Sequence, residues 1–130
     1  GQGKYIEAEE LYQRALAVFE RVHGPDHYDV AVTLNNLAAN LAAQGRTSRA
    51  EPCYRRSLAI KRACLGDGHP DTGTTANNLG MLLARAGRRE EALALLREAA
   101  TTLEAAIAAN HPRVQACRRN LARVEAGETI

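Results

Sequence analysis

Asparagine recurs at regular spacing inside stretches that otherwise read as helices rich in alanine and leucine. The triplet NNL begins at Asn35 and again at Asn77, and RNL begins at Arg119. Asparagine disfavours a helix interior because its amide competes for nearby backbone groups. The same amide offers two donors and an acceptor, so it can hold an extended peptide backbone without reading its sequence. The recurrence therefore indicates that these side chains either bind a ligand or join neighbouring helices.

The asparagines occupy two columns on their helices, and each column carries its own expectation. Asn36 points nearly opposite the apolar stripe of its helix, whereas Asn35 lies at the flank of that stripe, about 100° from Leu34. We expect the first column to face a peptide ligand, and its members are Asn36, Asn78 and Asn120. We expect the second column, Asn35 and Asn77, to hold neighbouring helices together. Each column could instead do the other job, so all five amides are candidates for ligand binding.

Arginine accumulates toward the C-terminal end of the chain. Arg119 takes the place of the first asparagine in the third triplet, Arg123 follows one turn later, and Arg85 ends the preceding helix of this type. Guanidinium binds carboxylate bidentately, so these three residues predict an acidic peptide, or a free C-terminal carboxylate, as the ligand. A solvated face is the alternative. Arg118 falls in the core column of Leu34, which suggests a capping helix, and we exclude it from the site.

Histidine placement does not predict a metal site. His23 and His27 are four residues apart, but the intervening Gly-Pro dipeptide prevents a helix between them. His27, His69 and His111 recur at one loop position, which indicates capping or loop packing. No cysteine or acidic partner is recognised at ligand spacing, and no GxSxG, HExxH or phosphate-binding loop occurs. We therefore expect no metal, no cofactor and no enzymatic activity. The pairs Glu9–Glu10 and Glu90–Glu91 read as surface charge.

Composition narrows the class of protein further. The 130 residues fit one domain or one short array of repeats, and a net charge of +2 is too small to indicate nucleic acid or membrane binding. No apolar run approaches the roughly 20 residues that cross a bilayer. Three cysteines without CxxC spacing predict small buried side chains in a reducing cytoplasm. The chain opens on glycine and shows no signal peptide, so we expect a fragment of a longer protein.

A repeat of 42 residues organises the whole chain. The same step without gaps carries Gly3 to Gly45 and Gly87, and it carries His27 to His69 and His111. Apolar residues within each unit recur with a period near 3.6, and Gly and Pro punctuate them, so each unit reads as two helices. The expected helices span residues 4–22, 29–43, 47–64, 71–85, 89–107 and 112–125. Repeated helix pairs bury their faces by stacking, which predicts an all-α solenoid.

The segment GKYIEAEELYQRALAVFERVHGPDHYDVAVTLNNLAANLAAQGR resembles the 42-residue tetratricopeptide repeats of the kinesin light chain type. The general tetratricopeptide spacing is matched by Leu37, Ala38, Leu41, Ala50, Tyr54 and Ser57. The resemblance implies a right-handed superhelix of antiparallel helix pairs whose first-of-pair helices line a concave groove for peptides. Residues 1–130 then form one array fragment: a lone second helix at 4–22, repeats at 29–64 and 71–107, and a last helix at 112–125 as a cap.

Two functions from different classes fit this sequence. The first is a protein–protein interaction scaffold that binds an extended peptide of a partner in the concave groove. The second is a structural or regulatory array that packs on another domain or on a second copy of itself. The helix at residues 4–22 carries apolar side chains without its first-of-pair partner, so a two-fold homodimer through this helix is expected. A monomer whose N-terminal helix frays is the alternative.

Overall fold

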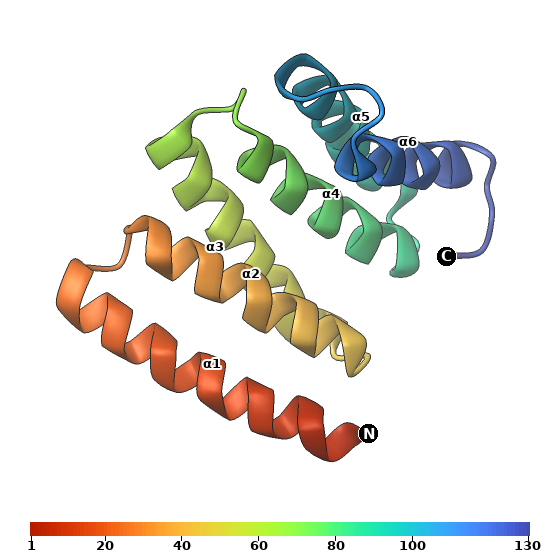
Figure 1. The fold of residues 1–130 in the computed structure, drawn as a ribbon. Coiled ribbons are helices and arrows are strands. Elements are labelled where there is room, and N and C mark those ends of the chain that lie inside the picture. Colours follow the sequence, from red (N-terminus) through yellow and green to blue (C-terminus); the bar gives the residue numbers. More distant parts are fainter. The chain divides into compact units, whose positions relative to one another are not determined.

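The computed structural model describes all residues from 1 to 130 and consists of six α-helices without strands. The helices are α1 (Gln2–His23), α2 (Tyr28–Ala43), α3 (Thr47–Leu65), α4 (Pro70–Arg85), α5 (Arg89–Ala106) and α6 (Pro112–Glu125) (Figure 1). Each helix begins and ends within two residues of its expected range. The chain divides into two compact units, Gly1–Cys64 and Leu65–Ile130. None of the helices is long and apolar enough to cross a membrane.

Histidine caps the first helix of every repeat. The Nδ1 atoms of His27, His69 and His111 each accept a hydrogen bond at 3.1 Å from the backbone N–H two residues further on. A side-chain acceptor at this position satisfies one of the N–H groups that a helix start leaves without a partner. Proline follows the cap at the start of α4 and α6, where its missing N–H is no loss. The predicted capping role of the three loop histidines is confirmed.

Glycine ends the same helices in a left-handed conformation. Gly45 and Gly87 have φ angles of 76° and 80°, and the next residue donates its N–H back to the carbonyl of Leu41 or Leu83 at 2.9 Å. These bonds satisfy carbonyls that the last turn leaves open. Gly127 ends α6 in the same way, but two residues earlier than the repeat step would place it. The helix α6 therefore has 14 residues, whereas α2 and α4 have 16 each.

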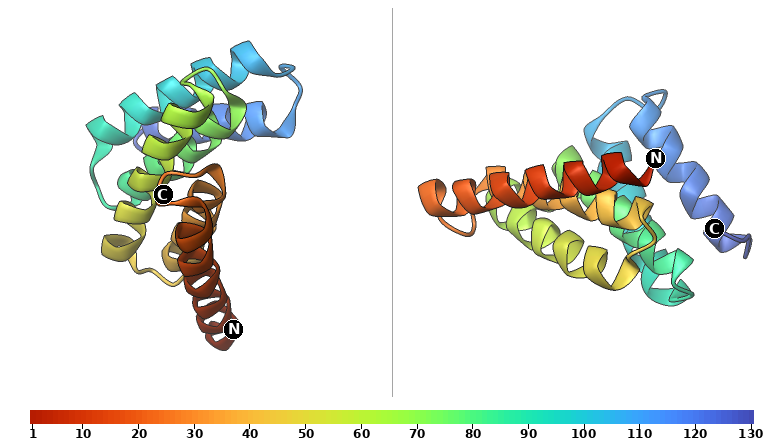
Figure 2. Two further views of the ribbon diagram at one scale, coloured as in Figure 1. Left: turned by 90° about the vertical axis from the view of Figure 1, so that its left-hand side faces the viewer. Right: turned by 90° about the horizontal axis from the view of Figure 1, so that it is seen from below.

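The first unit packs α1 and α3 against α2. In the views of Figures 1 and 2, α1 and α2 run side by side in antiparallel directions. The core comprises Val30, Ala31, Leu34 and Ile60, with Leu16, Phe19 and Cys53 packed against it. The Ser57 hydroxyl donates to the buried carbonyl of Ala31 at 2.6 Å, so α3 approaches the backbone of α2 closely.

The second unit packs α4 and α6 against α5, and α4 and α6 touch each other over a smaller area. Its core includes Met81, Leu93, Leu96 and Val124, with Ala84, Leu121 and Ile130 against it. Gly80 permits the close approach of α4 and α5, because a Cβ atom at this position would lie 2.9 Å from Cγ of Leu96. A small residue is therefore needed on α4 where the two helices touch.

The cysteines differ in their surroundings. Cys117 is buried, as predicted, and Cys53 is half-buried. The prediction is wrong for Cys64, which is exposed because it lies at the end of α3 beside a loop. Its thiol is 3.5 Å from the carbonyl of Asp26 in the α1–α2 loop. All three are free thiols.

Candidate functional site

The face of α2 opposite its apolar stripe carries Asn36 among small side chains. This α2 face, defined by one column of the helix, comprises Val32, Asn36, Ala39 and Ala43. Val32 is half-buried and the other three are exposed. The Asn36 amide makes no hydrogen bond within the chain. The α2 face thus presents an amide that can donate and accept hydrogen bonds, surrounded by short apolar side chains. An extended peptide backbone could approach this amide without a steric clash.

The asparagines of the second unit are more enclosed. Asn78 is half-buried, and both Asn35 and Asn78 already take part in a polar interaction within the chain. Met81 is buried although it occupies the column of exposed Ala39. The reason is that Met81 packs into the core formed with Val124 of α6. The neighbouring helix therefore covers part of the face that α4 would otherwise present.

Two asparagines from different columns meet between α4 and α6. Nδ2 of Asn120 donates to Oδ1 of Asn77 at 3.2 Å, and both residues are half-buried. Asn120 belongs to the column expected to face a ligand, whereas Asn77 belongs to the column expected to join helices. Because the two helices lie next to each other, one column of α6 comes opposite the other column of α4. This amide pair links two successive repeats directly.

The arginines of the second unit divide into neutralised and unpaired groups. Arg118 donates to Glu104 at 2.8 Å, and Arg113 donates to Asp71 at 3.4 Å. The three arginines predicted to bind an acidic ligand lie elsewhere: Arg85, Arg119 and Arg123 are all exposed. None of these three pairs with a carboxylate, although Arg123 donates to the carbonyl of Thr129 at 3.2 Å. Their charges therefore remain available to an anion.

A buried carboxylate near the N-terminus was missed by sequence reasoning. The Glu9 side chain is only 11% exposed, so its interpretation as surface charge is wrong. It accepts hydrogen bonds from Arg46 at 2.9 Å, Gln44 at 3.2 Å and Gln13 at 3.3 Å, and Arg49 lies at 3.3 Å. These donors come from α1, α3 and the loop between α2 and α3. The 42-residue repeat places the apolar Leu93 in the same column as Glu9, which indicates that a side chain in this column can be buried.

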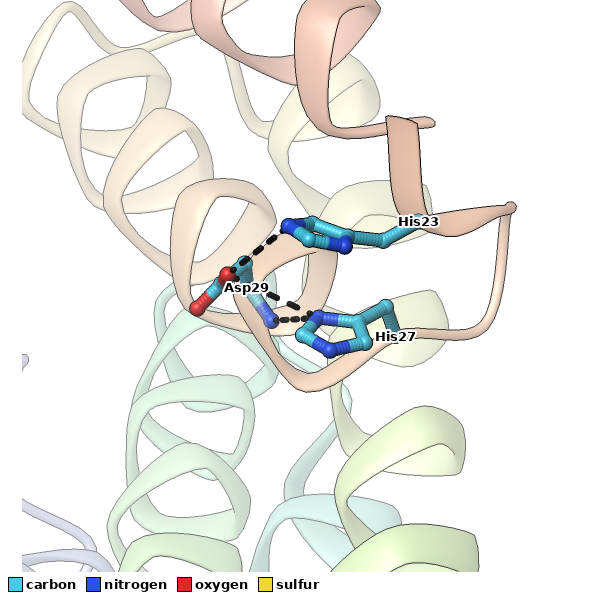
Figure 3. Close-up of side chains that lie close together, drawn as sticks. All are labelled: His23, His27 and Asp29. Carbon is cyan, nitrogen blue, oxygen red and sulfur yellow. Dashed lines mark hydrogen bonds and ion pairs between the residues drawn. The ribbon is translucent and has the colours of Figure 1, made fainter. Parts of the chain in front are cut away.

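The loop between α1 and α2 brings two histidines and an aspartate together (Figure 3). Gly24, with φ of 87°, ends α1 and turns the chain back, so that His23 stacks on His27 with ring centroids 4.2 Å apart. His23 Nε2 and His27 Nδ1 each lie 3.6 Å from Oδ2 of Asp29. The expectation that no acidic residue stands at ligand spacing is wrong for this loop. The turn, and not a shared helix face, creates the cluster.

A shallow apolar hollow of about 250 Å³ lies at the C-terminal end of the second unit. It is lined by Ala84, Gly87, Arg89, Val124, Gly127, Glu128 and Ile130. None of the eight residues predicted to bind a peptide belongs to this lining. The hollow therefore shares no residue with the asparagines and arginines that were predicted to bind a peptide.

Two solved structures share this fold. A crystal structure of a Podosopora anserina protein, described as a kinesin light chain with nearly identical TPR-like repeats, is 24% identical, with a TM-score of 0.86. The crystal structure of BtubC (BKLC) from P. vanneervenii is 23% identical, with a TM-score of 0.87. The matches cover 95% and 98% of this chain but only 58% and 52% of those chains. At these identities the likeness establishes the fold alone, an all-α repeat solenoid, as predicted.

The family itself is established by sequence. No curated protein sequence matches this chain significantly. A family model described as tetratricopeptide repeat matches three overlapping segments, residues 1–63, 34–105 and 71–128. Together these segments cover nearly the whole chain. The chain belongs to the tetratricopeptide repeat family, whose members are generally protein-interaction scaffolds.

Proposed function

We propose that this chain is a scaffold that binds an extended peptide segment of a partner protein along its first-of-pair helices. The exposed amide of Asn36 carries the proposal. A polar residue of poor helix propensity sits in mid-helix, satisfies no group within the chain, and is flanked by small exposed side chains. A backbone peptide group of a ligand would supply the partners that this amide lacks.

The spacing of the repeats suits an extended ligand. Packed neighbouring helices such as α4 and α6 lie about 8–10 Å apart, and an extended chain advances about 3.3 Å per residue. Within the second unit, one amide on α4 and one on α6 would therefore contact the ligand about three residues apart. Contacts through the backbone leave the ligand's side chains to determine specificity, and Asn78 and Asn120 would contribute with whatever hydrogen-bonding capacity their existing partners leave.

A peptide-library pull-down tests the groove. We expect captured peptides to bind Asn36→Ala more weakly by about 1–3 kcal/mol, because a ligand polar group is left unsatisfied. The folded state should be unaffected, since the amide has no partner within the chain. Asn110→Ala is the matched control, because Asn110 is exposed in the loop before α6. Equal affinities for the two variants would contradict the proposed role of Asn36.

The ligand that we propose is acidic where it meets the second unit. Arg85, Arg119 and Arg123 are exposed and pair with no carboxylate. Exposed charges are screened by salt, with a Debye length of about 8–10 Å near physiological ionic strength. The affinity for a captured peptide should therefore fall as salt rises from low to physiological concentration. A flat dependence would remove the acidic ligand and leave the peptide scaffold intact.

A second function, an array that packs on another copy of itself, is favoured by the exposed apolar side chains of α1. Leu11 is 61% exposed and Val22 is 64% exposed. Full burial of such a side chain stabilises an association by about 1.5–3 kcal/mol. A self-complementary contact between two α1 helices would therefore favour a two-fold homodimer. We also propose a cytoplasmic location, which three free thiols support.

A further inference from the structure

We propose that His23, His27 and Asp29 form a binding site for a dication of the Zn²⁺, Ni²⁺ and Cu²⁺ class. The three side chains come from the end of α1, the loop and the first turn of α2, and one donor atom from each lies within 4.8 Å of the others (Figure 3). This site is independent of the peptide scaffold, since none of its residues belongs to the asparagine or arginine columns.

The distances lie close to those of a first coordination sphere. Both imidazole nitrogens lie 3.6 Å from Oδ2 of Asp29. Ligands bound tetrahedrally at about 2.0–2.2 Å from a metal lie roughly 3.3–3.5 Å from one another. Oδ2 therefore needs to move by only a few tenths of an ångström toward each nitrogen. The two imidazole nitrogens must also move closer together, because the three donor atoms as a set lie only within 4.8 Å of one another. Water would complete the coordination, because three protein ligands leave a tetrahedral position open.

The side chains have room to make this adjustment. His23, His27 and Asp29 side chains are 38%, 43% and 42% exposed, so rotation meets little packing resistance. The rings are stacked with 20° between their planes, and a metal must lie in the plane of each imidazole, so the stack has to open. His27 Nδ1 must also release the Asp29 N–H that it caps. Both requirements lower the metal affinity of the site. Its imidazole nitrogens favour Zn²⁺, Ni²⁺ and Cu²⁺ over Ca²⁺ and Mg²⁺, which prefer oxygen ligands.

The chain contains a natural comparison for this cluster. The second repeat keeps His69 and Asp71 in the same capping arrangement, but Leu65 stands where the first repeat has His23. The third loop has Ile107 and Arg113 at the two outer positions. His23 is thus the one histidine outside the repeated pattern, in a column that is otherwise apolar. Only the first loop presents all three donors.

Isothermal titration of the chain with ZnCl₂ and with NiCl₂ tests the site. We expect one saturable site in the unmodified chain. Loss of a residue that only hydrogen-bonds to a metal ligand costs about 10–100-fold in metal affinity, so loss of a ligand itself should cost at least about tenfold. We expect that loss for His23→Leu, which copies the second loop, and for Asp29→Asn. Circular dichroism on each variant verifies that the helices persist.

Two control variants separate this site from other donors. Asp71→Asn makes the same change in the loop that lacks a third ligand, and it should leave affinity unchanged. Cys64→Ser removes the exposed thiol that contacts Asp26 of this loop, and it should also leave affinity unchanged. The proposal is overturned if His23→Leu binds as tightly as the unmodified chain, if Cys64→Ser abolishes binding, or if no binding heat appears at millimolar metal.

Discussion

The amide pair of Asn77 and Asn120 explains one reason for placing asparagine inside these helices. Its hydrogen bond links α4 to α6, and both partners are half-buried. We expect Asn120→Ala to lower the free energy of unfolding by about 0.5–1.5 kcal/mol in urea denaturation, partly offset by better helix propensity. Asn36→Ala, which breaks no internal bond, should not lower it. A double-mutant cycle with Asn77→Ala should show coupling between the two sites. Strictly additive effects would mean that the pair contributes nothing.

The thiol of Cys117 gives a pH-dependent contribution to stability. Burial, and to a smaller extent the nearby Glu104 carboxylate, raises the pKa of Cys117 from 9.0 to about 11. The unfolded chain therefore ionises first as the pH rises. This contribution to stability is fully present below about pH 9 and is lost as the pH rises toward 11. Cys117→Thr, which copies Thr33 and Thr75 in the same column, should show a smaller loss of stability over this interval.

Thiol alkylation checks the same assignment by a second route. At pH 8 an alkylating reagent should modify exposed Cys64 first and buried Cys117 last, because the thiolate is the reactive form. Mass spectrometry of the partly modified chain gives the order. Modification of Cys117 in the folded chain at the rate of Cys64 would contradict both its burial and its raised pKa.

At the scale of helices, Glu9 ties three segments of the first unit together. Its carboxylate accepts from Gln13 on α1, Gln44 after α2 and Arg46 before α3. We expect Glu9→Ala to lower the free energy of unfolding by about 1–3 kcal/mol, because Gln44 and Arg46, which are half-buried, lose their acceptor. The arginines are partly exposed and can turn to water, which favours the lower end. Glu10→Ala, at the exposed neighbouring position, should change stability by less than about 0.5 kcal/mol in the same denaturation measurement.

Helix positions were predictable because they follow from local rules. The apolar period, the capping histidines and Gly45 or Gly87 act within a few residues, so sequence alone located every helix to within two residues. The polar contacts were not predictable in this way. Arg46 meets Glu9 across 37 positions, and Asn120 meets Asn77 across 43, so both depend on how helices pack. The histidine cluster depends on the turn at Gly24, which periodicity does not describe.

At the scale of the molecule, comparison of α1 with the equivalent positions of α3 shows which side chains of α1 are not covered by a neighbouring helix. Val18 occupies the column of Ile60, and Leu11 occupies the column of Cys53. On α3 this column packs on the preceding helix α2, where Ile60 is only 4% exposed. Val18 is 45% exposed, because α1 has no preceding helix in this chain. We propose that this exposed face of α1 contacts a helix that does not belong to the first unit.

A second copy of the chain can supply that helix, because α1 of one molecule can pack on α1 of another about a two-fold axis. We expect sedimentation equilibrium to show a monomer–dimer equilibrium for the unmodified chain. Leu11→Glu should shift the chain to monomer, because the dimer would bury an unpaired charge. Ala17→Glu is the matched control and should leave the equilibrium unchanged, since Ala17 shares its column with Ala59 and Thr101, which are exposed in both units. If the unmodified chain sediments as a monomer at every concentration, the homodimer is excluded.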